Sequence, residues 1–230
     1  MTTAPKKVVV FGSGDQARMV QVYLAQDSPH EVVAFTVPER YLGETKLRGV
    51  NMVSFERVEE VYPPGEFAMF VAMGFGRINQ ARAEGYVAAK QKGYELISYV
   101  CSKVVLWGKV EIGENAFILD DTVIHPFTKI GNNVCIPGRC AIGHDVVIGD
   151  HCFIAPNAVI LGHVTIEPYC FIGASATLRN GVRIAPRCVV GAGAIILKDT
   201  RERGVYMAPG TPTAVMSSDL LTPFFGAPRQ

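Results

Sequence analysis

The segment CAIGHDVVIGDHCFIAPNAVILGHVTI, which runs from Cys140 to Ile166, has an isoleucine at every sixth position. The period extends over more than a third of the chain, and its members are Ile112, Ile118, Ile124, Ile130, Ile136, Ile142, Ile148, Ile154, Ile160, Ile166, Ile172, Leu178, Ile184, Val190 and Ile196. Four positions after each of these residues the chain has only Ala, Thr, Val or Cys. A helix, with a period of about 3.6, and a flat strand, with a period of about 2, cannot keep such a repeat on one face.

Short strands that turn a corner every six residues satisfy both restrictions, because the aliphatic and the small residues then point into a narrow prism. The sequence therefore predicts a hexapeptide parallel β-helix over residues 101–200, with three strands in each coil. Residues 18 positions apart should stack at a strand spacing of about 4.8 Å. Four of the six cysteines (Cys140, Cys152, Cys170 and Cys188) occupy the small inward position. We expect these to act as small apolar residues, with no disulfide and no catalytic thiol in the chain.

Residues 1–100 have a different pattern, in which apolar strands alternate with helical segments. This alternation predicts a small Rossmann-like α/β domain. Its first turn reads GSGDQA, and Gly12, Ser13, Gly14 and Asp15 would present backbone N–H groups to a phosphate at a helix N-terminus. Gly74, at the end of the strand candidate FAMFVAMGF, joins them as a candidate substrate contact. The alternative is a tight strand-to-helix turn that binds no ligand.

The composition limits the classes of partner. The net charge is +1 and no basic block is present, so neither nucleic acid nor an anionic membrane is an expected partner. The N-terminal apolar run is too short for a signal peptide, and no run approaches the ~18 residues of a membrane span, which predicts a cytoplasmic protein. Residues 201–230 leave the six-residue register and are predicted to form a C-terminal strap and tail.

The glycine turn together with the unbroken hexapeptide domain resembles the left-handed β-helix acyltransferases of the sialic acid O-acetyltransferase and bacillosamine N-acetyltransferase type. The resemblance implies a homotrimer, acetyl-CoA as donor without a metal, and a nucleotide-linked sugar held by the N-terminal domain. It also implies a catalytic His followed by an acid, here His144 and Asp145. Acetyl-CoA contacts are implied at the backbone of Gly162, Ala174 and Ala192, with Phe153 in place of a His near the thioester.

The repeat itself supports a special role for His144. Its column of stacked residues reads Pro126, His144, Gly162, Asn180 and Lys198, which lies outside the inward series. Because Gly162 has no side chain, we expect a slot and an accessible backbone N–H beside the imidazole. His144 would then act as general base, Asp145 would orient it, and Gly162 would stabilise the oxyanion.

Other interpretations remain open at this point. The same base would serve a sugar O-acetyltransferase. A β-helical zinc lyase would need three converging histidines, but His125, His144, His151 and His163 fall in different columns, so convergence is not expected. A binding scaffold without catalysis is a further alternative. We expect His151 and His163 to be solvated outer residues, with orientation of Asp145 as the alternative role for His163.

Overall fold

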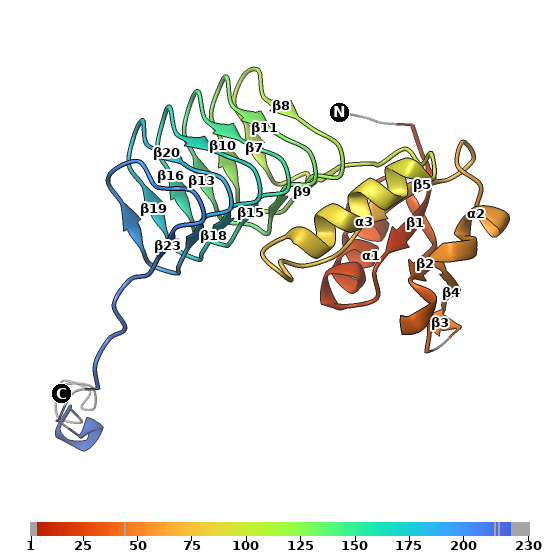
Figure 1. Cartoon of the computed structure of the whole chain (residues 1–230), viewed down its shortest axis with the longest axis horizontal. Coiled ribbons are helices and arrows are strands. Elements are labelled where there is room, and N and C mark those ends of the chain that lie inside the picture. The colour runs from red at the N-terminus through yellow and green to blue at the C-terminus, as the bar shows by residue number, and fades with distance from the viewer. Residues whose placement is uncertain (1–3, 44, 214, 216, 222–230) are drawn as a thin grey trace, which may run out of the picture.

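The computed structural model describes residues 4–43, 45–213, 215 and 217–221, and it consists of an α/β domain beside a β-helix (Figure 1). The elements of the N-terminal domain are β1 (Lys7–Phe11), α1 (Asp15–Asp27), β2 (Glu31–Val37), η1 (Glu39–Tyr41), β3 (Lys46–Leu47), β4 (Val50–Ser54), η2 (Phe55–Arg57), α2 (Val58–Val61), β5 (Ala68–Val71) and α3 (Gln80–Gln91). The strands form one sheet in the order β3-β4-β2-β1-β5, and the pairs β4–β2, β2–β1 and β1–β5 are parallel. This is the strand order of a Rossmann-like sheet.

Both faces of the central strand β1 are buried, which explains its continuous apolar sequence. Val8 and Val10 pack in one cluster with α1, and Val9 packs in another with Ala89 of α3. The sequence pattern KVVVF is therefore that of a strand covered on both sides.

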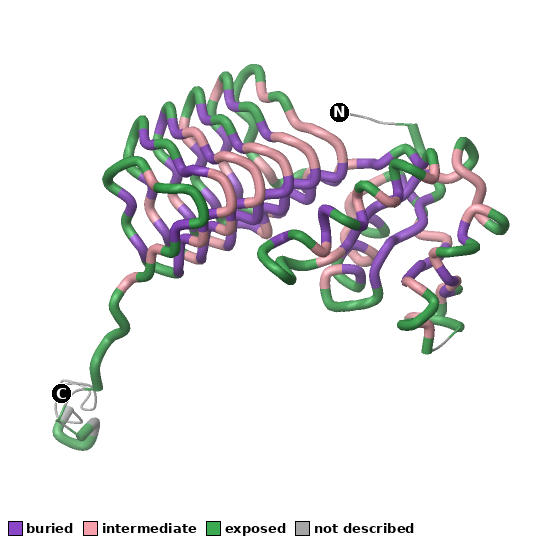
Figure 2. The backbone as a smooth tube through the Cα atoms, viewed as in Figure 1, coloured by how far each residue is buried: buried purple, intermediate pink, exposed green. Residues whose placement is uncertain are grey.

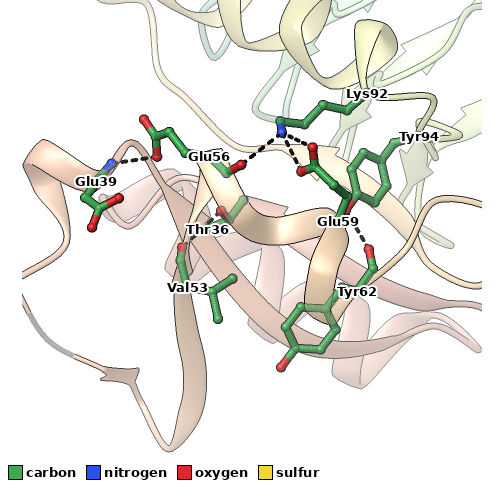
Figure 3. A network of polar contacts seen from close by, with 8 residues as sticks. All are labelled: Thr36, Glu39, Val53, Glu56, Glu59, Tyr62, Lys92 and Tyr94. Atoms are coloured by element: carbon green, nitrogen blue, oxygen red, sulfur yellow. Dashed lines mark hydrogen bonds and ion pairs between the residues drawn. The ribbon is translucent and has the colours of Figure 1, made fainter.

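A polar network joins the segment of η2 and α2 to the residues that follow α3 (Figure 3). The Lys92 ammonium, just after α3, forms an ion pair with Glu59 of α2 and donates a hydrogen bond to the Glu56 carbonyl oxygen at 3.4 Å. The Tyr94 hydroxyl donates to the Tyr62 carbonyl oxygen at 2.5 Å. These contacts hold the short helical connection against the end of α3.

The β-helix consists of three parallel sheets in the described residues, which we call the β6, β7 and β8 faces. The β6 face contains β6 (Tyr99–Val100), β9 (Phe117–Ile118), β12 (Cys135–Ile136), β15 (Phe153–Ile154), β18 (Phe171–Ile172), β21 (Val189–Val190) and β23 (Val205–Tyr206). The β7 face contains β7 (Val105–Leu106), β10 (Val123–Ile124), β13 (Ala141–Ile142), β16 (Val159–Ile160), β19 (Thr177–Leu178) and β22 (Ile195–Ile196). The β8 face contains β8 (Glu111–Ile112), β11 (Lys129–Ile130), β14 (Val147–Ile148), β17 (Thr165–Ile166) and β20 (Arg183–Ile184).

The register of the coils confirms the predicted stacking. Val123 pairs with Ala141, and Ala141 pairs with Val159, so partners are 18 positions apart. The inward isoleucines and the small residues between them form one continuous buried cluster along the prism. Buried stretches recur in successive coils (Figure 2), whereas the corner between the β7 and β8 faces is largely exposed. All six cysteines are buried free thiols.

The N-terminal domain packs on the β6 face. The outward residues of this face include Tyr99, Phe117, Cys135 and Phe153, and they share a buried cluster with strands β1, β2 and β5. The buried guanidinium of Arg82 in α3 donates hydrogen bonds to carbonyl oxygens of the β-helix at 3.0–3.3 Å. In a prism with three faces, the edge between the β7 and β8 faces is therefore the edge opposite this domain.

The last coil of the β-helix is shorter than the others. Val189 pairs with Val205, so this coil is two residues shorter than the rest. After β23 the chain extends away from the β-helix, with Met207 70% exposed, to a short 3-10 helix η3 (Ser218–Leu221). The predicted strap thus includes one β-helix strand, and residues 222–230 of the predicted tail lie outside the described residues.

Candidate active site

His144 and Asp145 lie at the corner between β13 and β14, on the edge opposite the N-terminal domain. Asp145 has a φ of 55°, the left-handed conformation that recurs at corners of successive coils and that Asp tolerates. The His144 Nδ1 and Asp145 Oδ2 atoms are 2.9 Å apart, and the two side chains are 52% and 43% exposed. In a neutral imidazole, a hydrogen bond to this carboxylate requires the proton on Nδ1, which leaves the lone pair on Nε2.

Gly162 lies one coil further along the same corner, and the absence of a side chain there makes room for the His144 ring. A Cβ at this position would lie 2.7 Å from His144 Nε2 and 3.1 Å from Asn180 Oδ1. Gly143 allows the two coils to stack closely, since a Cβ there would lie 2.5 Å from the Gly162 nitrogen, as at the equivalent glycines of other coils. None of the described residues accepts a hydrogen bond from the Gly162 N–H. The corner therefore brings the imidazole next to a backbone N–H that has no partner among the described residues, but Gly162 is buried, whereas an accessible N–H was expected.

His163 follows Gly162 at this corner and brings a second imidazole close to the first. The His144 and His163 ring centroids are 4.8 Å apart and the rings are perpendicular. One ligand atom from each of His144, Asp145 and His163 can be chosen such that all lie within 4.8 Å of one another. Two of the four histidines thus come together, because side chains in adjacent columns of adjacent coils reach each other diagonally, but no third histidine joins them in the described residues. His163 is exposed, as expected.

A cavity of about 450 Å³ lies between the N-terminal domain and the β6 face. Its lining includes all five candidate substrate residues, namely Gly12, Ser13, Gly14, Asp15 and Gly74, together with Gln16, Met19, Ala72, Met73, Phe75, Phe117, Cys135, Pro137 and Phe153. This volume is typical of a small-molecule site. The turn that precedes α1 thus faces a cavity, which favours the ligand-binding interpretation of the glycine motif over a turn without a ligand.

The two glycines of the turn have different physical roles. Gly12 has a φ of 136°, and a Cβ there would lie 2.4 Å from the Ala72 carbonyl oxygen, so close strand packing requires glycine. Gly14 is the N-cap of α1, and a Cβ there would meet no atom within 4 Å. A side chain would therefore fit at position 14 without a steric clash, whereas position 12 does not tolerate one.

The β6 face supplies the other wall of the cavity through residues that sequence reasoning missed, except Phe153. Phe117, Cys135 and Phe153 are outward residues of successive coils, and Phe153 stacks on Phe171 at 5.6 Å. Burial raises the pKa of the Cys135 thiol to about 11, so it stays protonated at neutral pH. The aromatic column at 18-residue spacing was the available signal, because outward aromatic residues on one face indicate that something covers that face.

The candidate acetyl-CoA residues fall at two corners. Gly162 lies beside His144, whereas Ala174 lies between β18 and β19, at the edge between the β6 and β7 faces, and Ala192 lies one coil further along that edge. Phe153 lies in the interdomain cavity. In one chain the base thus lies on the edge opposite the cavity, whereas Ala174 borders the β6 face that carries the cavity.

His151 is not a solvated outer residue, so that prediction is wrong. It is 8% exposed, its Nδ1 atom lies 2.9 Å from Asn133 Nδ2, and its ring packs against Tyr169. Asn133 in turn accepts a hydrogen bond from Asn115, whose amide pairs with both backbone groups of Val71 in β5. The corner between the β8 and β6 faces is therefore an interdomain contact.

In the described part of the chain, no helix combines the length and the apolar character that crossing a membrane requires.

Comparisons with known proteins bear on this arrangement. Residues 109–142, 127–162 and 163–198 match the family model described as Bacterial transferase hexapeptide (six repeats). A comparison with curated proteins found no match.

Several solved structures share nearly the whole fold. The acetyltransferase domain of PglB from Neisseria gonorrhoeae FA1090 is 19% identical, with 87% of this chain and 95% of that chain covered and a TM-score of 0.74. PerB from Caulobacter crescentus, in complex with CoA and GDP-perosamine, is 22% identical, with 89% and 97% covered and a TM-score of 0.76. WeeI from Acinetobacter baumannii AYE is 23% identical, with 88% and 96% covered and a TM-score of 0.72.

These likenesses confirm the predicted fold class, an α/β Rossmann-like domain followed by a left-handed parallel β-helix of hexapeptide repeats. The repeats over residues 109–198 are of the kind that the transferase family model describes.

Proposed function

We propose that this protein is an acetyl-CoA-dependent N-acetyltransferase that acts on a nucleotide-linked amino sugar. The observation that carries the proposal is the His144–Asp145 pair, whose imidazole packs against Gly162. The transferase family model and the CoA and GDP-perosamine named for the PerB structure support the same class of reaction.

The reaction is direct acyl transfer without a covalent intermediate on the protein. The sugar amine attacks the thioester carbonyl carbon, and His144 Nε2 takes the proton that the amine loses as the C–N bond forms. Asp145 stabilises the imidazolium through Nδ1–H, and the Gly162 N–H donates to the carbonyl oxygen as it gains charge. When the C–S bond breaks, the proton on His144 passes to the CoA thiolate.

The two ligands occupy different parts of the chain. The cavity beside Gly14 holds the nucleotide, with phosphate oxygens at the N-terminus of α1. The edge that carries Ala174 and Ala192 holds CoA by backbone contacts.

The separation of these parts supports an active site shared between copies in a homotrimer. His144 lies on the edge opposite the face that carries the cavity, so the His144 of one copy acts on the sugar that a second copy holds. A closed three-fold arrangement of one prism edge against the next copy provides such a site.

The proposal is tested by incubating the purified protein with acetyl-CoA and a panel of UDP-, GDP- and dTDP-linked amino sugars and measuring thiol release. Hydroxyl counterparts of the same sugars form the second arm. Faster release with an amino sugar supports N-acetylation, and faster release with a hydroxyl counterpart supports O-acetylation. No release with either panel contradicts the proposal.

A further inference from the structure

The corner that carries His144 contains a second imidazole, that of His163, which the proposed acyl transfer does not use. The His163 side chain is exposed, and the angle between the planes of the His163 and His144 rings is 89°. The His163 backbone N–H donates a hydrogen bond to the His144 carbonyl oxygen at 2.9 Å. No hydrogen bond joins His163 to Asp145 in the described residues. The structure therefore leaves the His163 imidazole available to a ligand.

His144, Asp145 and His163 are together a suitable set of donors for a divalent metal ion. Two neutral imidazoles and one carboxylate are ligands that Zn²⁺ prefers in proteins. Their donor atoms lie within 4.8 Å of one another, and across the described residues no other cluster of three such side chains is found. Zinc binding would require these exposed side chains to rotate until all three donors lie about 2.0–2.2 Å from one ion.

We propose that these three residues bind Zn²⁺ reversibly and that the bound ion inhibits the protein. The side chains are exposed, so the ion reaches them from solvent and completes its tetrahedral shell with water.

The inhibition follows from where the ring proton of His144 must lie. Coordination through Nδ1 replaces the proton shared with Asp145, so the remaining proton of the neutral ring lies on Nε2, which can no longer accept one. Coordination through Nε2 uses the lone pair directly. In either geometry the general base is blocked. This inhibitory effect rests on the proposed function, whereas the binding of zinc does not.

Zinc binding is tested by calorimetry on the full chain after chelator treatment, at a pH above 7. The variant His163→Asn removes one imidazole, and Asn tolerates the φ of 58° at this position. His125→Ala is the matched control, because His125 is an exposed histidine of the preceding coil that is not part of the cluster. We expect one zinc per chain in wild type and in the control, and at least about tenfold weaker binding in His163→Asn. Equal affinity in all three proteins would overturn the site.

The effect on the reaction is measured in a separate assay of acetyl transfer with added ZnCl₂. Zinc should inhibit wild type and His125→Ala, chelator should restore the rate, and His163→Asn should keep its zinc-free rate. Zinc binding that depends on His163 without slower acetyl transfer would overturn the inhibitory role. If the protein acetylates no sugar but zinc binding still depends on His163, the proposed function fails and the zinc site stands.

Discussion

The His144 Nδ1 atom lies 2.9 Å from Asp145 Oδ2, in two residues that are neighbours in sequence at an exposed corner. The corner turn makes this contact possible, because Asp145 adopts left-handed backbone geometry and its carboxylate folds back toward the preceding ring. The pair does not contribute to the core of the prism. Its chemistry can therefore be changed without loss of the fold.

Replacement of His144 should remove most of the activity. We expect His144→Ala to lower kcat by about 10²–10⁴-fold, because the amine then loses the general base that takes its proton. Acetyl-CoA affinity and the melting temperature should stay near wild type, since residue 144 lies outside the buried cluster. His125→Ala serves as the control for surface changes at this edge. A folded His144→Ala variant with near wild-type kcat would remove His144 from the mechanism.

Asp145→Asn should have a smaller effect. Asn keeps the shape and tolerates the left-handed backbone, and the change removes only the charge that supports the imidazolium. We expect kcat to fall by roughly tenfold to a hundredfold with the KM values unchanged. A loss as large as that of His144→Ala would show that Asp145 has a role beyond the support of His144.

Gly162→Ala tests the slot. The added Cβ would lie 2.7 Å from His144 Nε2, and the exposed imidazole would have to move aside. We therefore expect a folded protein whose kcat falls by about 10²-fold or more, because both the base and the N–H donor become displaced. Steady-state kinetics combined with thermal unfolding check this result, and wild-type kcat would contradict the assigned slot.

The sequence alone predicted the β-helix well, because each coil repeats the same inward positions from Ile112 to Ile196 and a period of six has few structural solutions. It also predicted the His144–Gly162 relationship, because stacking by 18 residues is a consequence of that fold. It did not predict β3 and β4, whose short segments lack a strong apolar pattern.

The interdomain contacts could not be derived from the repeat. Arg82 appears in a helical segment as an ordinary charged residue, yet it is 1% exposed and donates to carbonyl oxygens of the β-helix. The wrong prediction for His151 has the same origin, since the position of a residue in a column does not say which face another domain covers. The aromatic column through Phe117 and Phe153 was the signal that would have identified this face.

The buried His151 should make stability depend on pH. Burial is the main cause that lowers its pKa, with the Arg82 charge in the same direction and Asp150 opposed, while Tyr86 and Tyr169 pack against the ring. The folded protein thus holds neutral His151, whose Nδ1 accepts from Asn133. Its contribution is fully present above the unfolded pKa of about 6.5 and is lost as the pH falls through the folded pKa.

The matched variant is His151→Asn, which extends the column formed by Asn115 and Asn133 and does not titrate. Denaturant unfolding at a series of pH values below 7 should give a smaller decrease in unfolding free energy for this variant than for wild type. Burial also lowers the pKa of His30, which adds to the pH dependence of the unfolding free energy. Because wild type and variant both contain His30, the difference between their pH dependences reports on His151. Identical pH dependence would show that His151 does not titrate on unfolding.

Gly14→Leu should weaken binding of the nucleotide sugar alone. The position is free of neighbours within 4 Å and lines the cavity, so a leucine fits the fold and fills the site. We expect KM for the nucleotide sugar to rise by about tenfold or more, with acetyl-CoA affinity intact. Gly12→Ala is the contrasting variant, which should unfold because its Cβ would meet the Ala72 carbonyl oxygen. Weaker acetyl-CoA binding in Gly14→Leu would reverse the assignment of ligands to the two domains.

Mixing two inactive variants tests whether the site is shared between copies. A His144→Ala chain keeps its cavity and a Gly14→Leu chain keeps its base, so a hybrid trimer pairs the intact cavity of one with the intact His144 of the other. Random assembly from equal amounts, after joint unfolding and refolding, should restore about a quarter of the wild-type sites. The rate is measured at a nucleotide-sugar concentration where neither variant alone turns over. A mixture no faster than the two variants assayed separately, with hybrid trimers confirmed by native mass spectrometry, would mean that each chain uses its own His144 and its own cavity.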